Sequence, residues 1–184
     1  LIVGNHHARE ISTPTIALYA LNQLTTLYGS DPSITAVVNS NEIWIAPTWN
    51  PDGYNYVYNT DNMWRKNRHV FTGGVGVDIN RNYPMGWDTA CAGDLDPASE
   101  TYKGPFVASE AETQTLLLWS QDRHFTRVID YHSYGRQVLY AYDCLTHPFS
   151  AYLQSEAVAL ANASGYGGAT RAPSLPSQRQ AACS

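Results

Sequence analysis

The chain of 184 residues has few basic residues, few cysteines and no long apolar run. Lysine and arginine number 11 against 16 acidic residues, a formal net charge of -5. This balance disfavours a nucleic-acid-binding protein, which usually carries a basic face. No apolar stretch approaches the roughly 18 residues that span a bilayer, so we expect no membrane span. The three cysteines are not spaced like a metal site, and their odd number leaves at least one unpaired in a monomer.

The residues that are present indicate one globular domain with a real core, because 43% are apolar and 12% aromatic. Thirteen tyrosines and five tryptophans beside few lysines suit a secreted hydrolase. We expect the protein to be a monomer. Asn162-Ala163-Ser164 is a glycosylation sequon that would matter in a eukaryotic secretory route. A Cys91–Cys144 disulfide is one pairing that the sequence leaves open.

Apolar periodicity predicts strands that alternate with helices, which is typical of an α/β sheet with helices packed against it. Asn50–Gly53 has strong turn chemistry, and 54–75 is expected to be irregular. Ser109 and Glu112 match a capping box. From Ser164 onward the pattern ends in an irregular tail. The expected strands cover 1–4, 42–47, 125–131 and 137–142, and the expected helices 13–28, 109–120 and 148–163.

The sharpest motif is Asn5-His6-His7-Ala8-Arg9-Glu10, which follows a strand and precedes a helix. His7 and Glu10 are three residues apart, so a tight turn or first helical turn puts both side chains on one side. Imidazole and carboxylate are good zinc ligands, and open α/β sheets bind ligands at the carboxyl ends of their strands. An isolated pair of this kind is nevertheless common on protein surfaces by chance.

A catalytic zinc site needs a third protein ligand, and His132 is the best candidate because it ends a predicted strand. Other histidines are His69, His124 and His147, and His6 is expected to point elsewhere because it adjoins His7. Metal-bound histidines usually donate their other N–H to a carboxylate or carbonyl. Asp78 is a candidate for that role behind His7, although turn formation is the commoner role of such a residue.

Two cationic clusters stand out in this acidic chain: Met63–Arg68 and Asn80–Tyr83. Arginine forks suit carboxylate anions, and asparagine adds neutral donors. A basic run is often only a solvated surface, and we interpret Lys66 in that way.

Together these segments resemble the zinc metallocarboxypeptidases, specifically the carboxypeptidase A/B subfamily. The matching segments occur in the family's order: HAREIS (7–12), NPDGY (50–54), MWRKNR (63–68), GVDINRN (76–82), SETYKGP (99–105) and HSY (132–134). The resemblance implies a mixed, mostly parallel twisted sheet with helices on both faces. It also implies one Zn²⁺ per chain and an exopeptidase acting on peptide or protein C-termini.

The resemblance further implies a role for each matched residue. His7, Glu10 and His132 would bind zinc, with Asp78 behind His7. Arg68 would polarise the scissile carbonyl, and Asn80 and Arg81 would hold the terminal carboxylate of the substrate. Residues expected to line the upstream subsites and the entry path are Arg9, Ser133, Tyr134 and Arg65.

The family's general base lies well downstream of the third ligand, and no residue here matches it. After His132 the only acidic side chains are Asp143 and Glu156. Glu156 is expected to be a surface residue of a helix. Asp143 would suit a preference for basic C-terminal residues, and it equally suits a surface position at the end of a strand. We therefore expect a chain truncated at both ends, with a partial catalytic domain over 1–163 and the irregular tail over 164–184.

Two other functions remain open. Related zinc folds act as amidohydrolases on acyl amino acids or cell-wall peptides. Alternatively, the chain is a truncated zinc-binding pseudoenzyme that lacks the general base.

Overall fold

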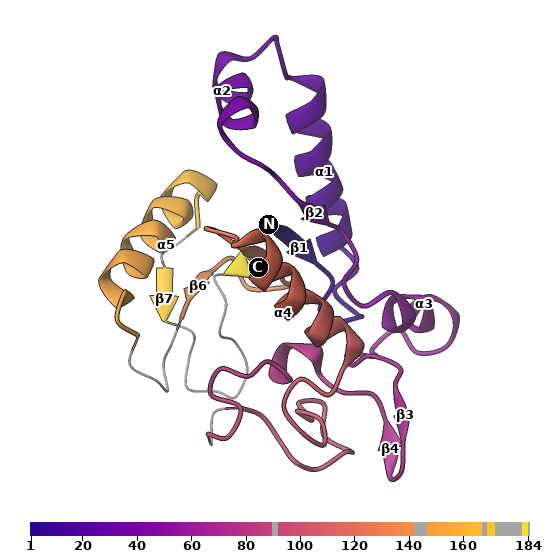
Figure 1. The fold of residues 1–184 in the computed structure, drawn as a ribbon. Coiled ribbons are helices and arrows are strands. Elements are labelled where there is room, and N and C mark those ends of the chain that lie inside the picture. The colour runs from indigo at the N-terminus through magenta and orange to yellow at the C-terminus, as the bar shows by residue number, and fades with distance from the viewer. Residues whose placement is uncertain (90–91, 142–146, 167–168, 172–181, 184) are drawn as a thin grey trace.

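The computed structural model describes residues 1–89, 92–141, 147–166, 169–171 and 182–183 (Figure 1). Its helices are α1 (Thr13–Thr26), α2 (Pro32–Ser40), α3 (Pro51–Asn59), α4 (Ala111–Arg123) and α5 (Ser150–Ser164), with a short 3₁₀ helix, η1, over Ile79–Arg81. Its strands are β1 (Ile2–Gly4), β2 (Ile45–Ala46), β3 (Val70–Phe71), β4 (Gly74–Val75), β5 (Ile129–Tyr131), β6 (Val138–Tyr140), β7 (Ala169–Arg171) and β8 (Ala182–Cys183).

Six of these strands form one mixed sheet in the order β2-β1-β5-β8-β6-β7. All neighbouring pairs are parallel except β6 and β8. The expected α/β architecture with a mostly parallel sheet is therefore confirmed. A separate hairpin pairs β3 with β4.

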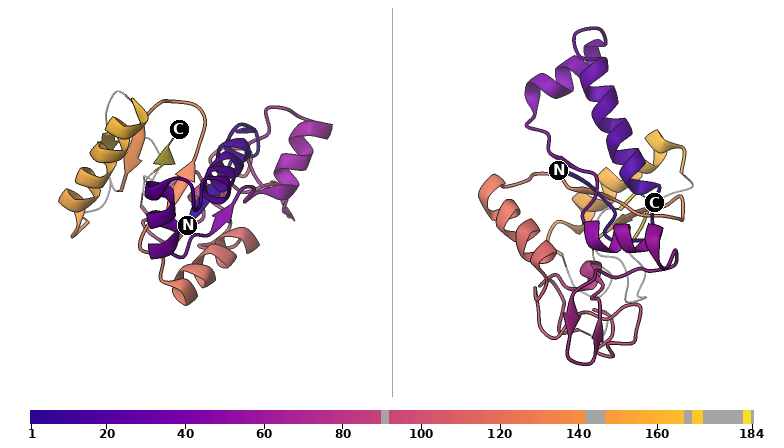
Figure 2. Two further views of the ribbon diagram at one scale, coloured as in Figure 1. Left: turned by 90° about the horizontal axis from the view of Figure 1, so that it is seen from above. Right: turned by 90° about the vertical axis from the view of Figure 1, so that its right-hand side faces the viewer.

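Helices cover both faces of the sheet (Figure 2). Successive side chains of a strand point to opposite faces of the sheet, and β1 contacts a helix on each face. Val3 packs with Leu116 of α4 in one apolar cluster. A side chain at Gly4 would instead come within 3.0 Å of the carbonyl oxygen of Thr13, where α1 begins. Helix α5 packs on Val138 and Tyr140 of β6 in a second cluster.

Several local expectations were wrong. The turn expected at Asn50–Gly53 is the start of α3, because the Asn50 side chain accepts a hydrogen bond from the Gly53 N–H and caps the helix. The capping box expected at Ser109 and Glu112 does not form. Glu110 occupies the N-cap position of α4, and the Ser109 hydroxyl donates to its side chain.

The stretch 54–75 is more regular than expected, since it contains most of α3 and the β3–β4 hairpin. Helix α2 was not expected either; Asp31 caps it by accepting from the backbone N–H groups of Ser33 and Ile34. The tail, expected to be irregular, supplies β7 and β8 to the sheet. None of the described helices is long and apolar enough to cross a membrane. Cys91 and Cys144, the residues of the open disulfide pairing, lie outside the described residues, as does Asp143.

Candidate metal centre

Two adjacent parallel strands bring the predicted ligands together. Strands β1 and β5 pair with Val3 opposite Asp130 and Gly4 opposite Tyr131, so both end at the same edge of the sheet. His6 and His7 lie just beyond β1, and His132 directly follows β5. The parallel register therefore places both segments at one point, where open α/β sheets bind their ligands.

A turn at Asn5 orients the first two histidines. Asn5 has a positive φ of 63°, a conformation that asparagine tolerates better than most residues. Its side-chain N–H groups donate to the carbonyl oxygens of His7 and Ala8 at 3.1 and 3.2 Å. Its backbone N–H donates to the Thr13 hydroxyl at 2.8 Å, which ties the turn to the start of α1. All these groups are buried, so the turn is held from inside the fold.

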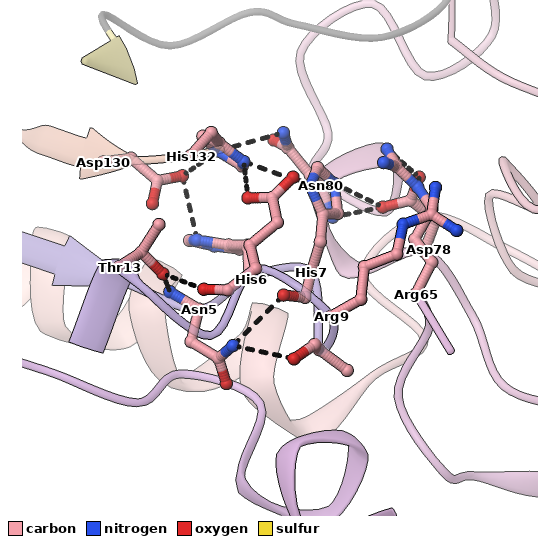
Figure 3. A network of polar contacts seen from close by, with 12 residues as sticks. Asn5, His6, His7, Arg9, Thr13, Arg65, Asp78, Asn80, Asp130 and His132 are labelled. Atoms are coloured by element: carbon pink, nitrogen blue, oxygen red, sulfur yellow. Dashed lines mark hydrogen bonds and ion pairs between the residues drawn. The ribbon is translucent and has the colours of Figure 1, made fainter. Parts of the chain in front are cut away.

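The donor atoms of His7, Glu10 and His132 converge. The rings of His7 and His132 lie side by side (Figure 3), with their centroids 4.6 Å apart. His7 Nδ1 lies 2.8 Å from Glu10 Oε1, and His132 Nδ1 lies 2.9 Å from Glu10 Oε2. The two Nδ1 atoms are 3.1 Å apart. All three side chains are at most 8% exposed.

This donor set fits a catalytic zinc ion. Two imidazole nitrogens and one carboxylate oxygen are an established donor set for such sites. Ligands around a tetrahedral zinc with bonds of about 2.0–2.1 Å are separated by roughly 3.3 Å. The observed separations of 2.8–3.1 Å are a few tenths of an ångström smaller, so small shifts would open the site to the ion.

A charged network lies behind His7. His7 Nε2 lies 3.3 Å from Asp78 Oδ1, and Asp78 is the carboxylate that was expected behind His7. Arg65 donates to Asp78 Oδ2 through Nε and Nη2, at 3.0 and 2.9 Å. Burial alone would raise the pKa of Asp78, but Arg65 and Arg81 hold that pKa well below its usual range. The carboxylate is therefore ionised and can accept the N–H of His7.

The two histidines differ in electrostatic surroundings. Burial and the nearby Arg65 lower the pKa of His7, which favours the neutral imidazole that metals bind. Burial also opposes the charged form of His132, yet Asp130 and Glu10 raise the pKa of His132 to about 10. Burial would raise the pKa of Glu10, but the two histidines hold that pKa below its usual value. Metal binding at His132 Nδ1 would thus displace a proton.

Two residues of this site, His6 and Asp130, were not predicted from the sequence. His6 was expected to point elsewhere, but its ring stacks with that of His132 at a centroid distance of 6.1 Å. Asp130 Oδ2 lies 2.9 Å from both His6 Nδ1 and His132 Nε2. One signal was present, since Asp130 is a charged residue within an apolar strand that leads to a candidate ligand. A buried charge of this kind is costly unless it is paired and hydrogen-bonded.

The cluster Met63–Arg68 is also arranged differently from our expectation. Arg65, expected on the entry path, contacts Asp78 in the centre of the site. Arg68, expected at the scissile carbonyl, stacks on the rings of Tyr56 and Trp64 at 3.6 and 4.5 Å. It lines a cavity of about 660 Å³ together with Glu110 and Glu112. The catalytic role expected for Arg68 stays a prediction.

Lys66 is not solvated as expected but only 4% exposed, because its ammonium group donates to the carbonyl oxygen of Pro97 at 2.8 Å.

The residues expected to bind substrate differ in burial and in their contacts. Asn80 Nδ2 lies 3.5 Å from His132 Nε2. Arg81 is buried, and its Nη1 donates to the Asn80 carbonyl oxygen. Arg9 lies nearer the surface, where it donates to the Met63 carbonyl oxygen and to Glu100. Ser133 follows the third candidate ligand, and Tyr134 is 99% exposed.

Comparison with known proteins gives a match to one family model, described as zinc carboxypeptidase, over residues 1–180. The chain is 39% identical over 160 residues to a protein of Talaromyces marneffei named inactive metallocarboxypeptidase ecm14, covering 80% of this chain and 26% of that protein. It is 36% identical over 143 residues to carboxypeptidase A1 of Bos taurus, covering 76% of this chain and 34% of that enzyme.

Among solved structures, the crystal structure of thrombin activatable fibrinolysis inhibitor has the same fold. It superimposes with a TM-score of 0.85 at 24% identity, covering 98% of this chain and 48% of that one. The chain therefore spans between about a quarter and a third of the length of the two curated relatives, and about half of the solved structure.

Proposed function

Because the chain belongs to the zinc carboxypeptidase family, we propose that it forms the metal-binding part of an enzyme that releases C-terminal amino acids from peptides. The observation that carries this proposal is the convergence of His7, Glu10 and His132 on one point at the end of the sheet. The activity, substrates and partners of the whole protein are part of the proposal, as are an extracellular location and a monomeric state.

We assign His7 Nδ1, Glu10 and His132 Nδ1 as the protein ligands of one Zn²⁺. Zinc, when bound, acts as a Lewis acid toward a carbonyl group and makes water a nucleophile near neutral pH. The protein holds the ligands rigidly, because Asn5 fixes the turn and β5 fixes the strand end. Burial of the ligands also strengthens the electrostatic interactions within the site.

We assign to Arg65, instead of Arg68, the role of stabilising negative charge on the scissile carbonyl oxygen. Arg65 Nε and Nη2 are used by Asp78, which fixes the plane of the guanidinium. Its Nη1 has no protein partner among the described residues and can donate to substrate. A donor held in place before the reaction stabilises developing charge without reorganisation.

Asn80 and Arg81 are proposed to recognise the terminal carboxylate, which would restrict the enzyme to free C-termini. The contact of Arg81 with the Asn80 carbonyl oxygen supports a joint role, because it orders the two residues relative to each other. Arg9, Ser133 and Tyr134 are proposed to line the upstream subsites. Tyr134 is exposed and Arg9 lies at the surface, as such a role requires.

The described residues that follow His132 offer no candidate for the general base. Glu156 is 44% exposed on α5 and accepts a hydrogen bond from Arg127 at 2.8 Å, as expected for a surface residue. Among the described residues after His132 it is the only acidic side chain. We therefore propose that a carboxylate from another part of the polypeptide completes the centre.

A second candidate function is peptide binding without turnover. It is favoured by the relative that is named inactive. In that case the protein would bind zinc and peptides with a free C-terminus but would release no amino acid.

The experiment that tests the proposal compares two peptides of the same sequence, one with a free C-terminal carboxylate and one with a C-terminal amide. Mass spectrometry would follow the release of the last residue by the zinc-loaded protein. We expect release from the free peptide only. Equal cleavage of both peptides would favour an amidohydrolase, and tight binding of the free peptide without cleavage would favour the second candidate function.

A further inference from the structure

A buried carboxylate lies behind the third candidate ligand, in a position that an apolar core does not tolerate without partners. Asp130 is fully buried in β5 and pairs in register with Val3. Val3 belongs to the apolar cluster with Trp49, Ile79 and Leu116. An ionised carboxylate is costly in such surroundings unless it is paired and hydrogen-bonded. Its partners therefore indicate what it is for.

The partners of Asp130 are two imidazole rings. Its Oδ2 lies 2.9 Å from His132 Nε2 on one side and 2.9 Å from His6 Nδ1 on the other (Figure 3). The far nitrogen of His6, Nε2, is hydrogen-bonded to the Tyr83 hydroxyl at 2.7 Å. A continuous polar chain therefore leads from the candidate ligand His132 through Asp130 and His6 to Tyr83.

The alternation of side chains along β5 explains why Asp130 lies beside His132. Asp130 and His132 are two residues apart, so their side chains leave β5 on the same face. The carboxylate thus meets Nε2 of His132, while Nδ1 of the same ring faces Glu10 at 2.9 Å. One ring nitrogen is committed to the protein, and the other is directed at the metal position.

We propose that Asp130 is the positioning residue of His132, and that His6 holds Asp130 in turn. Asp130 accepts the Nε2–H of His132, which fixes the tautomer whose Nδ1 lone pair is available to the metal. The inference rests on the zinc site proposed above and adds two residues that set how tightly that site binds its ion.

The second histidine ligand supports this interpretation, because a carboxylate lies behind it as well. Asp78 lies 3.3 Å from His7 Nε2 and is itself held by Arg65. Asp130 is closer to its histidine, at 2.9 Å, and its second partner is His6 instead of an arginine. Each imidazole of the centre thus has a buried anion behind it, and each anion has a separate partner.

The donor atoms of His6, Asp130 and His132 also lie within 4.8 Å of one another, close enough to surround a metal ion of their own. A single oxygen of Asp130 lies between the two rings, at hydrogen-bonding distance from both. An ion there would need His132 Nε2 as a ligand and would compete with the outer partner of the zinc site. We therefore assign His6 and Asp130 to the support of the proposed zinc site and not to a second metal site.

The test compares Asp130→Asn with wild type, with Asp122→Asn as the control for the same chemical change on an exposed side chain. Zinc affinity is measured by competition with a chromophoric chelator, and stability by urea unfolding in the presence of EDTA. We expect Asp130→Asn to weaken zinc binding about 10–100-fold, and Asp122→Asn to leave it within twofold of wild type. The visible spectrum of the Co²⁺-loaded protein should change only for Asp130→Asn.

Zinc affinity and a Co²⁺ spectrum equal to wild type in a folded Asp130→Asn variant would overturn the proposal. Absence of zinc binding by the wild type would instead refute the metal site itself, so the two failures are distinguishable. If Asp130→Asn does not fold, His6→Phe provides the second test, because it keeps an aromatic ring beside His132 but removes the contact with Asp130. We expect a loss of zinc affinity of about 3–10-fold, smaller than for Asp130→Asn, because His6 acts on His132 only through Asp130. An unchanged affinity in His6→Phe would contradict the role of His6.

Discussion

The two arginines of the Met63–Arg68 cluster provide a sharp test, because their guanidinium groups make different contacts in the structure. We predict that Arg65→Met damages the metal centre and that Arg68→Met leaves it intact. The substitutions are matched, since both remove a guanidinium and keep much of the apolar stem. They differ in what the guanidinium contacts: Asp78 for Arg65, and the rings of Tyr56 and Trp64 for Arg68.

The contacts set the expected magnitudes. Removing one partner of a buried ion pair destabilises a protein by about 3–5 kcal/mol. Asp78 would keep the Asn80 N–H at 3.1 Å and Arg81 at 3.9 Å, so we expect the lower limit, about 3 kcal/mol. Arg68→Met removes two cation–π contacts, worth about 1–2 kcal/mol together. Because Asp78 lies behind His7, Arg65→Met should also weaken zinc binding about 10-fold or more, whereas Arg68→Met should not.

The assay is urea unfolding in EDTA for stability and chelator competition for zinc affinity, carried out on both variants. Turnover gives a further readout in a protein with peptidase activity, where loss of an oxyanion donor costs about 100–1,000-fold in kcat. The reasoning is refuted if Arg68→Met loses more zinc affinity or turnover than Arg65→Met.

Three further predictions concern the turn that carries the ligands, the apolar core and the cap of α2. Asn5→Ala should destabilise the protein by about 1–3 kcal/mol, because two buried carbonyl groups lose their donor, and zinc affinity should fall with it; unchanged chelator competition would contradict this. Leu116→Ala removes a buried side chain of the apolar cluster that touches no candidate ligand; it should cost about 2–5 kcal/mol in urea unfolding yet leave zinc affinity within twofold. Asp31→Ala removes the cap of α2 and should lower stability by about 0.5–2 kcal/mol, again without an effect on zinc binding.

The candidate ligands were predictable because the information is local or topological. His7 and Glu10 are three residues apart, and His132 follows an apolar strand, so parallel strands were enough to bring the three together. Asp78 was predictable from the rule that a bound histidine has an acceptor behind it. The mostly parallel sheet followed from the family resemblance, which the comparisons bear out.

What could not be predicted depends on three-dimensional competition between similar groups. Arg65 and Arg68 are three residues apart and chemically identical. They differ only in their neighbours in the fold, because Arg65 lies beside Asp78 and Arg68 lies on two aromatic rings. His6 was misjudged because the direction of its ring depends on the positive φ of Asn5. The turn residues Asn50–Gly53 begin a helix instead, since the chemistry that closes a turn also caps a helix.

The most direct test of the account is the zinc-edge X-ray absorption spectrum of the purified protein, measured together with its zinc content. We predict one zinc per chain, with scattering from two imidazole rings and oxygen, and loss of that zinc in His132→Ala. A site with sulfur scattering at about 2.3 Å, or zinc that remains at full stoichiometry in His132→Ala, would contradict it.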